Sequence, residues 1–124
     1  MNRLVAFGFR CAHEEGMDTI LAIETSTAHG SVARYEEGRP VEVIEFTSDR
    51  SHNSVIFEPL RVVLKAGPPD LIVVGTGPGS YSGIRVGIAA ALGISLAHQV
   101  PLIGLPSLTA VGEAYGLERY AVTG

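Results

Sequence analysis

The segment from Asp70 to Ala97, DLIVVGTGPGSYSGIRVGIAAALGISLA, constrains the fold of this chain more than any other. Its first part, Leu71 to Val74, is wholly apolar, which is typical of a strand covered on both faces. A loop rich in glycine follows, and a long apolar helix is then predicted from Ser82 to His98, with Ser80 or Ser82 as its N-cap. A strand, a glycine loop and a helix in this order predict an α/β protein, in which such loops can hold anions.

The glycine loop matches neither of two familiar phosphate-binding patterns. A P-loop needs a lysine after its second glycine, and no lysine follows Lys65. The dinucleotide fingerprint needs a third glycine at its sixth position, which here is Ser80 or Ser82 when counted from Gly75 or Gly77. Two interpretations stay open: a loop that can hold a phosphate, and a tight turn whose glycines only allow close packing.

Composition excludes several classes of protein. A chain of 124 residues, of which 46% are hydrophobic and 18% charged, suits one globular domain. The net charge of −4 and the lack of a basic run argue against autonomous nucleic-acid binding. Cys11 is the only cysteine, so no internal disulfide can form, and a reducing, cytoplasmic location is predicted.

Neither a membrane span nor a metal site is predicted, and no cofactor is expected. Polar residues and glycines interrupt the longest apolar run before it reaches membrane-spanning length. The four histidines, at positions 13, 29, 52 and 98, lie too far apart in the sequence for a metal-binding pattern.

The predicted elements follow the order β-β-β-α-β-α-β-α-β. Turn residues and apolar patterns divide the chain, and Pro59 is expected to kink the first helix or to mark its first turn. Three meandering strands followed by β-α-β crossovers predict a mixed sheet with helices on its faces, the architecture of a ribonuclease H-like (actin-like ATPase) lobe. The predicted strands are 19–23, 31–35, 41–46, 71–74, 101–104 and 118–123, and the predicted helices are 53–65, 82–98 and 107–115.

The two ends of the chain are predicted to lie outside this lobe. Residues 1–16 differ from the rest, and Met17 directly precedes a clean strand, so these residues are interpreted as an upstream extension, with an extra edge strand as the alternative. Residues 17–117 then form the lobe. Residues 118–124 are expected to begin a second lobe that is missing from this chain.

Three segments together resemble the TsaB (YeaZ) family of bacterial tRNA threonylcarbamoyladenosine biosynthesis proteins. They are MDTILAIETST at Met17–Thr27, the helical segment around His52–Leu64, and GTGPGSYSGIRVG at Gly75–Gly87 with its continuation PLIGLPSL at Pro101–Leu108. The resemblance implies the first lobe of an actin-like fold. It also implies a non-catalytic subunit that, with a TsaE-like ATPase, supports a TsaD-like catalytic subunit in threonylcarbamoyl transfer to tRNA adenosine. A homodimer is the expected state without these partners.

The resemblance also bears on catalysis. TsaD-like proteins carry a His-x-x-x-His helix that holds a metal, and the matching positions here, Ser107 and Val111, cannot bind one. No catalytic residue and no metal ligand are therefore predicted, and the nucleotide loops are expected to be degenerate. Two alternatives stay open: an ATPase or kinase-type enzyme that uses these loops, and a metallopeptidase-family protein. The degenerate loop positions are Glu24, Thr25, Ser26, Thr27, Gly77, Gly79 and Ser80.

The helix predicted from Ser82 to His98 has almost no polar face, so its outer side is expected to meet a partner. Small residues recur in it every four positions and would form a smooth ridge that another helix could approach closely. The alternative is that the ridge packs on the chain's own sheet or on the helix before it. The predicted partner surface comprises Gly83, Arg85, Gly87, Ala91, Ile94, Ser95, Leu60 and Leu64.

Overall fold

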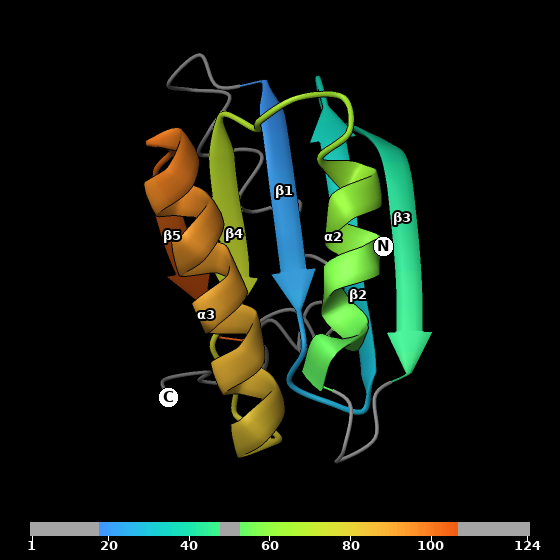
Figure 1. Cartoon of the computed structure of the whole chain (residues 1–124), viewed down its shortest axis with the longest axis vertical. Helices are drawn as coiled ribbons and strands as arrows, with labels where there is room; N and C mark the ends of the chain where they lie inside the picture. Colours follow the sequence, from blue (N-terminus) through green and yellow to red (C-terminus); the bar gives the residue numbers. More distant parts are fainter. Residues whose placement is uncertain (1–17, 48–52, 107–124) are drawn as a thin grey trace, which may run out of the picture.

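Five strands form one sheet in the order β3-β2-β1-β4-β5, and two helices lie across one of its faces in a computed structural model that describes residues 18–47 and 53–106 (Figure 1). The predictions for residues 1–16, 107–115 and 118–123 fall outside these described residues. The elements are β1 (Thr19–Glu24), β2 (His29–Glu36), β3 (Arg39–Thr47), the 3₁₀ helix η1 (Asn53–Ile56), α2 (Phe57–Val63), β4 (Leu71–Gly75), α3 (Tyr81–His98) and β5 (Leu102–Leu105).

The sheet is mixed, as predicted. β1, β2 and β3 form an antiparallel meander, while β4 pairs in parallel with both β1 and β5. Ala22 in the middle of β1 lies opposite Ala33 of β2 and Val73 of β4. Because β1 and β4 run in parallel, their carboxyl ends reach the same edge of the sheet, where the predicted nucleotide loops begin.

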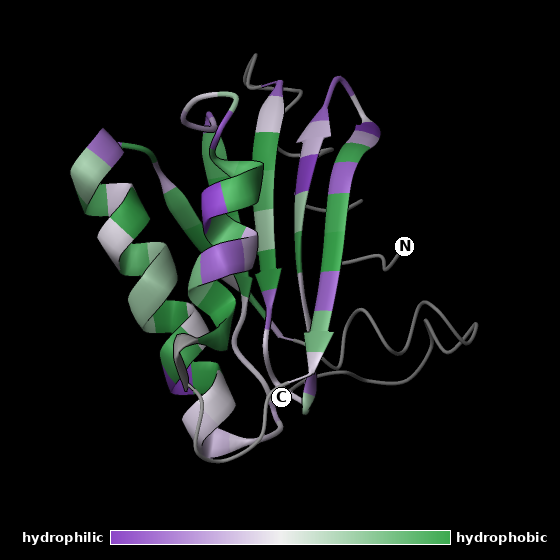
Figure 2. Cartoon of the chain, turned by 45° about the vertical axis from the view of Figure 1, so that its right-hand side comes forward, coloured by the Kyte–Doolittle hydropathy of each residue, from purple (hydrophilic) through white to green (hydrophobic). Residues whose placement is uncertain are grey.

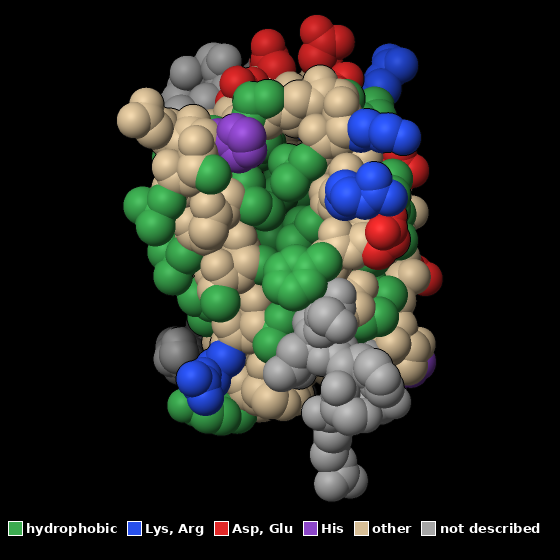
Figure 3. Space-filling view, viewed as in Figure 1, with side chains coloured by type: hydrophobic (Ala, Val, Ile, Leu, Met, Phe, Trp, Pro, Cys, Tyr) green, Lys and Arg blue, Asp and Glu red, His purple; other side chains and the backbone are tan. Residues whose placement is uncertain are grey.

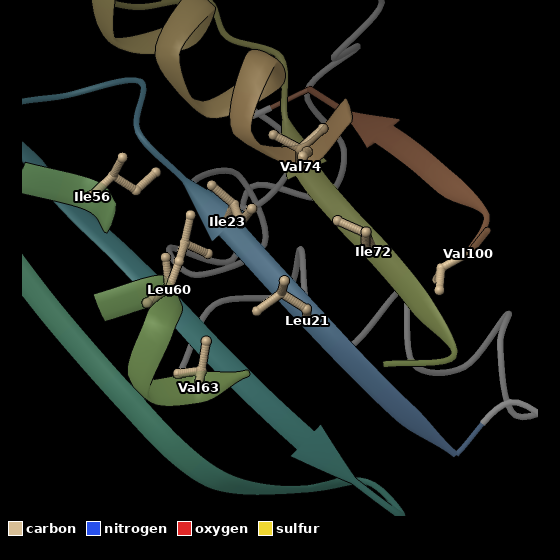
Figure 4. Packing of buried hydrophobic residues seen from close by; sticks show 10 residues of the cluster. Leu21, Ile23, Ile56, Leu60, Val63, Ile72, Val74 and Val100 are labelled. Carbon is tan, nitrogen blue, oxygen red and sulfur yellow. The ribbon is translucent and has the colours of Figure 1, made fainter. Parts of the chain in front are cut away.

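The strands differ in hydropathy according to their place in the sheet. β1 and β4 are central and almost wholly apolar, and all five residues of β4 are buried. β3 alternates between apolar and charged residues, as expected of a strand with one exposed face (Figure 2). Between the sheet and the two helices, Leu21, Ile23 and Ile72 pack against Ile56, Leu60 and Val63 (Figure 4).

A tight turn joins β2 to β3. Its two central residues, Glu37 and Gly38, have positive φ angles of 52° and 83°. Two such residues match the right-handed twist of a hairpin, and glycine at the second position adopts this conformation at no steric cost. The loop predicted over residues 36–40 is therefore a two-residue turn between longer strands.

The first predicted helix, 53–65, is divided in two. Residues 53–56 form η1, and the α-helix begins only at Phe57. Pro59 explains the change, because its ring nitrogen cannot donate a helical hydrogen bond and is tolerated only in the first turn. Of the two alternatives for Pro59, a mark of the first turn is correct.

None of the described helices is long and apolar enough to cross a membrane.

The opposite face of the sheet carries a second cluster of buried residues, and it contains an unpaired polar atom. Tyr35 is 6% exposed, and its hydroxyl is buried without a hydrogen-bond partner among the described residues. Burial raises the pKa of Tyr35 above its usual value, because the charged phenolate is disfavoured away from water.

Replacing this tyrosine by phenylalanine is expected to stabilise the protein. Tyr35→Phe removes an unsatisfied buried hydroxyl, which should raise the free energy of unfolding by about 1 kcal/mol in urea titrations at pH 7. Since the folded-state pKa is raised, wild-type stability should also fall as the pH rises above the unfolded value of about 10 towards the folded pKa. The Tyr35→Phe variant should lose this part of the pH dependence. Equal decline of both proteins above a pH of about 10 would contradict the assignment.

Candidate functional site

The turn after β1 is fastened to the glycine loop and to the first turn of α3. The Ser80 backbone N–H donates to the Ser26 carbonyl at 2.7 Å, and the Thr25 hydroxyl donates to the Gly83 carbonyl, also at 2.7 Å. Thr25 and Ser26 are each only 5% exposed. Two loops that are far apart in the sequence therefore close on each other at the carboxyl edge of the sheet.

The glycines at this edge lack a side chain where the backbone of the turn after β1 comes close. A Cβ atom added to Gly79 would lie 2.2 Å from the Ser26 carbonyl oxygen, and one added to Gly83 would lie 2.3 Å from the Thr25 carbonyl oxygen. Gly77 has a φ of +92°, and a Cβ atom there would lie 2.5 Å from the end of the Ile84 side chain. These contacts favour the interpretation of the loop as a tight turn that allows close packing.

The remaining polar groups of the edge bind nearby backbone. The Glu24 carboxylate accepts from the Ser26 N–H at 2.9 Å, and the Ser80 hydroxyl caps α3 by accepting from the Gly83 N–H at 3.3 Å. Thr27 bonds the backbone of His29. Of the two N-cap candidates, Ser80 is correct. The predicted loop positions thus come together, and their described contacts build the turn.

Potential metal ligands do not gather within residues 18–47 and 53–106. No three side chains of His, Cys, Asp or Glu in these ranges converge closely enough to hold a metal ion. Ser107 and Val111, the positions that match the TsaD-like histidines, lie outside the described residues.

An apolar groove of about 400 Å³ runs between α2 and α3 (Figure 3). Phe57, 61% exposed, stands on its α2 wall, and Leu60 is buried at its floor. On the α3 wall a Cβ atom added to Gly93 would meet no atom within 4 Å, so the helix backbone is open to the groove there. The lining residues are Phe57, Leu60, Arg61, Leu64, Ala89, Ala90, Gly93, Ile94, Ala97 and His98.

The ridge of small residues predicted as an outer surface faces the chain's own sheet, so that placement is corrected. Gly87 and Ala91 are buried, and a Cβ atom on Gly87 would lie 2.2 Å from the Thr25 hydroxyl oxygen. The same turn covers Gly83. Ser95, the last residue of the ridge, donates its hydroxyl to the Val100 carbonyl at 2.5 Å. The alternative interpretation, packing on the sheet, is the correct one for this ridge.

The other predicted interface residues lie elsewhere. Leu60, Leu64 and Ile94 line the groove. Arg85 is exposed near the start of α3, where its guanidinium lies 5.3 Å from the centre of the Tyr81 ring.

Sequence reasoning missed a second row of small residues, Ala89, Gly93 and Ala97, which line the groove at the same four-residue spacing. That spacing is visible in the sequence and could have identified the row as a second candidate surface. Leu92 and Leu96 are 47% and 79% exposed on the same helix. The outer side of α3 is therefore apolar as predicted, although different small residues form it.

Comparisons with known proteins agree with this geometry. The family model described as "TsaD: tRNA N6-adenosine threonylcarbamoyltransferase" matches residues 47–122, more than half of the chain. The tRNA threonylcarbamoyladenosine biosynthesis protein TsaB of Haemophilus influenzae is 33% identical over 101 residues, which cover 77% of this chain and 42% of that protein. The TsaB protein of Escherichia coli is 32% identical over 99 residues, with 76% and 42% covered. The chain thus spans less than half the length of these two relatives.

Solved structures give the same result for the fold. YeaZ from Pseudomonas aeruginosa superposes with a TM-score of 0.70 at 31% identity, covering 81% of this chain and 49% of that one. RuvC from Thermus thermophilus superposes with a TM-score of 0.59 at 13% identity, covering 84% of this chain and 72% of that one, which shows a shared fold alone. The mixed sheet with its helices is therefore a ribonuclease H-like lobe, as predicted. Within that class, the chain belongs to the TsaB (YeaZ) family and shares the TsaD family model.

Proposed function

We propose that this chain is a non-catalytic partner subunit in the threonylcarbamoyladenosine modification of tRNA. Its role is to bind a TsaD-like catalytic subunit and, together with a TsaE-like ATPase, to hold that subunit in an active arrangement in the cytoplasm. The observation that carries the proposal is the open apolar groove between α2 and α3, which suits an apolar helix of another protein.

Three further observations are consistent with this role. The carboxyl edge is filled by the Thr25–Ser26 turn, and its Ser80 N–H is already used by a backbone carbonyl. The chain carries a net charge of −4, which disfavours binding of tRNA by this chain alone. The relatives from H. influenzae and E. coli are named as biosynthesis proteins for the same tRNA modification.

A reconstituted modification assay tests the proposal. TsaD-like and TsaE-like proteins are incubated with tRNA, ATP and the threonylcarbamoyl donor, with or without this chain, and the modified nucleoside is quantified. We expect modification to fall at least tenfold when the chain is omitted, because the catalytic subunit then loses its partner. Equal modification with and without the chain would overturn the proposal.

The assay needs a control for intrinsic activity. ATP binding by the chain alone, followed by calorimetry and compared with a Glu24→Ala variant, separates a partner from an ATPase. We expect no difference between the two proteins. Micromolar ATP binding that is lost in the variant would instead favour the nucleotide-enzyme alternative.

A further inference from the structure

A buried arginine beneath the end of α2 is the most unusual charged group among the described residues. Arg34 lies in β2, and its side chain is 8% exposed. One guanidinium nitrogen, Nη1, donates to the Val63 carbonyl at 3.1 Å and to the Gly67 carbonyl at 2.7 Å. Its Nε donates to the Glu36 carboxylate at 2.9 Å. A single side chain therefore joins the sheet to the turn that ends α2.

These bonds add a polar anchor to the apolar packing that holds α2 on the sheet. The helix has seven residues, and its N-cap residue Ile56 makes no side-chain capping bond. Leu60 and Val63 bury its inner side against the sheet. Carbonyl groups at the end of a helix carry partial negative charge, so a buried guanidinium with fixed donor geometry is a strong anchor there.

We propose that Arg34 is a positioning residue for the groove: it sets how far α2 stands from α3 and thereby which partner helix the groove accepts. The inference rests on the proposed partner function. α2 supplies the Phe57 and Leu64 side of the groove, whereas α3 supplies the opposite wall. A shift of α2 therefore changes the width of the groove while α3 stays on β1 and β4.

A tryptophan reporter tests this placement without any partner. The chain contains no tryptophan, so Phe57→Trp places a single tryptophan on the groove wall, which can be excited selectively over the tyrosines. In this background we expect Arg34→Lys to shift the emission maximum and to change acrylamide quenching, because an ammonium group cannot reproduce the bonds that Arg34 makes to two carbonyls. Relative to the Phe57→Trp protein, the affinity of the Arg34→Lys variant for a TsaD-like subunit should fall at least tenfold.

A matched variant separates positioning from general loss of stability. Val73→Ala creates a cavity in the buried cluster on the other face of the sheet, away from the groove. Val73→Ala should lower the denaturation midpoint by a similar amount. It should nevertheless leave the emission maximum unchanged and the partner affinity within twofold of the Phe57→Trp protein. The proposal is overturned if both variants change these readouts equally, or if Arg34→Lys changes neither.

Two further results keep the test decisive. If Arg34→Lys does not fold, Glu36→Gln, which removes the charge of the carboxylate bound to Nε, should shift both readouts in the same direction by a smaller amount. An unchanged Glu36→Gln protein would then contradict the proposal. If the parent protein binds no TsaD-like subunit, the proposed function fails, and the emission comparison alone decides whether Arg34 positions α2.

Discussion

Gly83→Ala is expected to destabilise the protein by about 3 kcal/mol, at the upper end of the usual cost of overpacking. The added Cβ atom would lie 2.3 Å from the Thr25 carbonyl oxygen. That oxygen belongs to backbone, and Thr25 is held in place by the 2.7 Å bond from its hydroxyl to the Gly83 carbonyl. α3 must therefore move away from the turn after β1, which breaks the contacts that close the carboxyl edge.

Gly93→Ala is the matched control for this prediction. It lies in the same helix, but an added Cβ atom would meet nothing within 4 Å. Alanine favours helix over glycine, so this variant should gain up to about 1 kcal/mol. Urea unfolding of both variants measures the difference. If Gly83→Ala is tolerated as well as Gly93→Ala, the edge is looser than the structure indicates, and the interpretation of the glycine loop as a packing device is wrong.

The sequence predicted the framework because its signals there are strong. An unbroken apolar run identified β4, and the alternation in residues 41–46 identified β3. Serines before an apolar helix limited the N-cap to Ser80 or Ser82, of which Ser80 is the one observed. Three segments, at Met17–Thr27, around His52–Leu64 and at Gly75–Gly87 with its continuation, together indicated the family. Each of these depends on local pattern, which a sequence displays directly.

The orientation of α3 could not be predicted in the same way. The helix is apolar on all sides and carries two rows of small residues, one through Gly87 and one through Gly93. Hydropathy cannot distinguish the rows, because both fit a close helix contact. The choice depends on Thr25, which closes against Gly83 and Gly87 from a distant turn, since Thr25 and Gly83 are 58 residues apart in the sequence.

The buried role of Arg34 was missed for a similar reason. An arginine among apolar strand residues is a visible signal, but its partners are carbonyl groups at the end of α2 and in the turn after it. Backbone acceptors carry no signature in a sequence. The groove itself likewise depends on how far α2 and α3 stand apart, which is a property of packing.

Gly93→Leu is expected to weaken partner binding by about 30-fold or more while leaving the fold at least as stable. A leucine side chain at this position would project into the groove, where the backbone of α3 is now open. A partner helix could then no longer approach the row of Ala89, Gly93 and Ala97. Loss of a central interface contact of this kind typically lowers affinity by about 30-fold or more.

The opposite signs of the two effects make this prediction diagnostic. Leucine also favours helix over glycine, so the free energy of unfolding should rise by up to about 1 kcal/mol. Calorimetric titration against a TsaD-like subunit measures the affinity, and urea unfolding measures the stability. Gly93→Ala, with only a methyl group in the groove, should retain most of the binding. A Gly93→Leu protein that binds as tightly as the parent would place the partner surface away from this groove, even if the partner role itself holds.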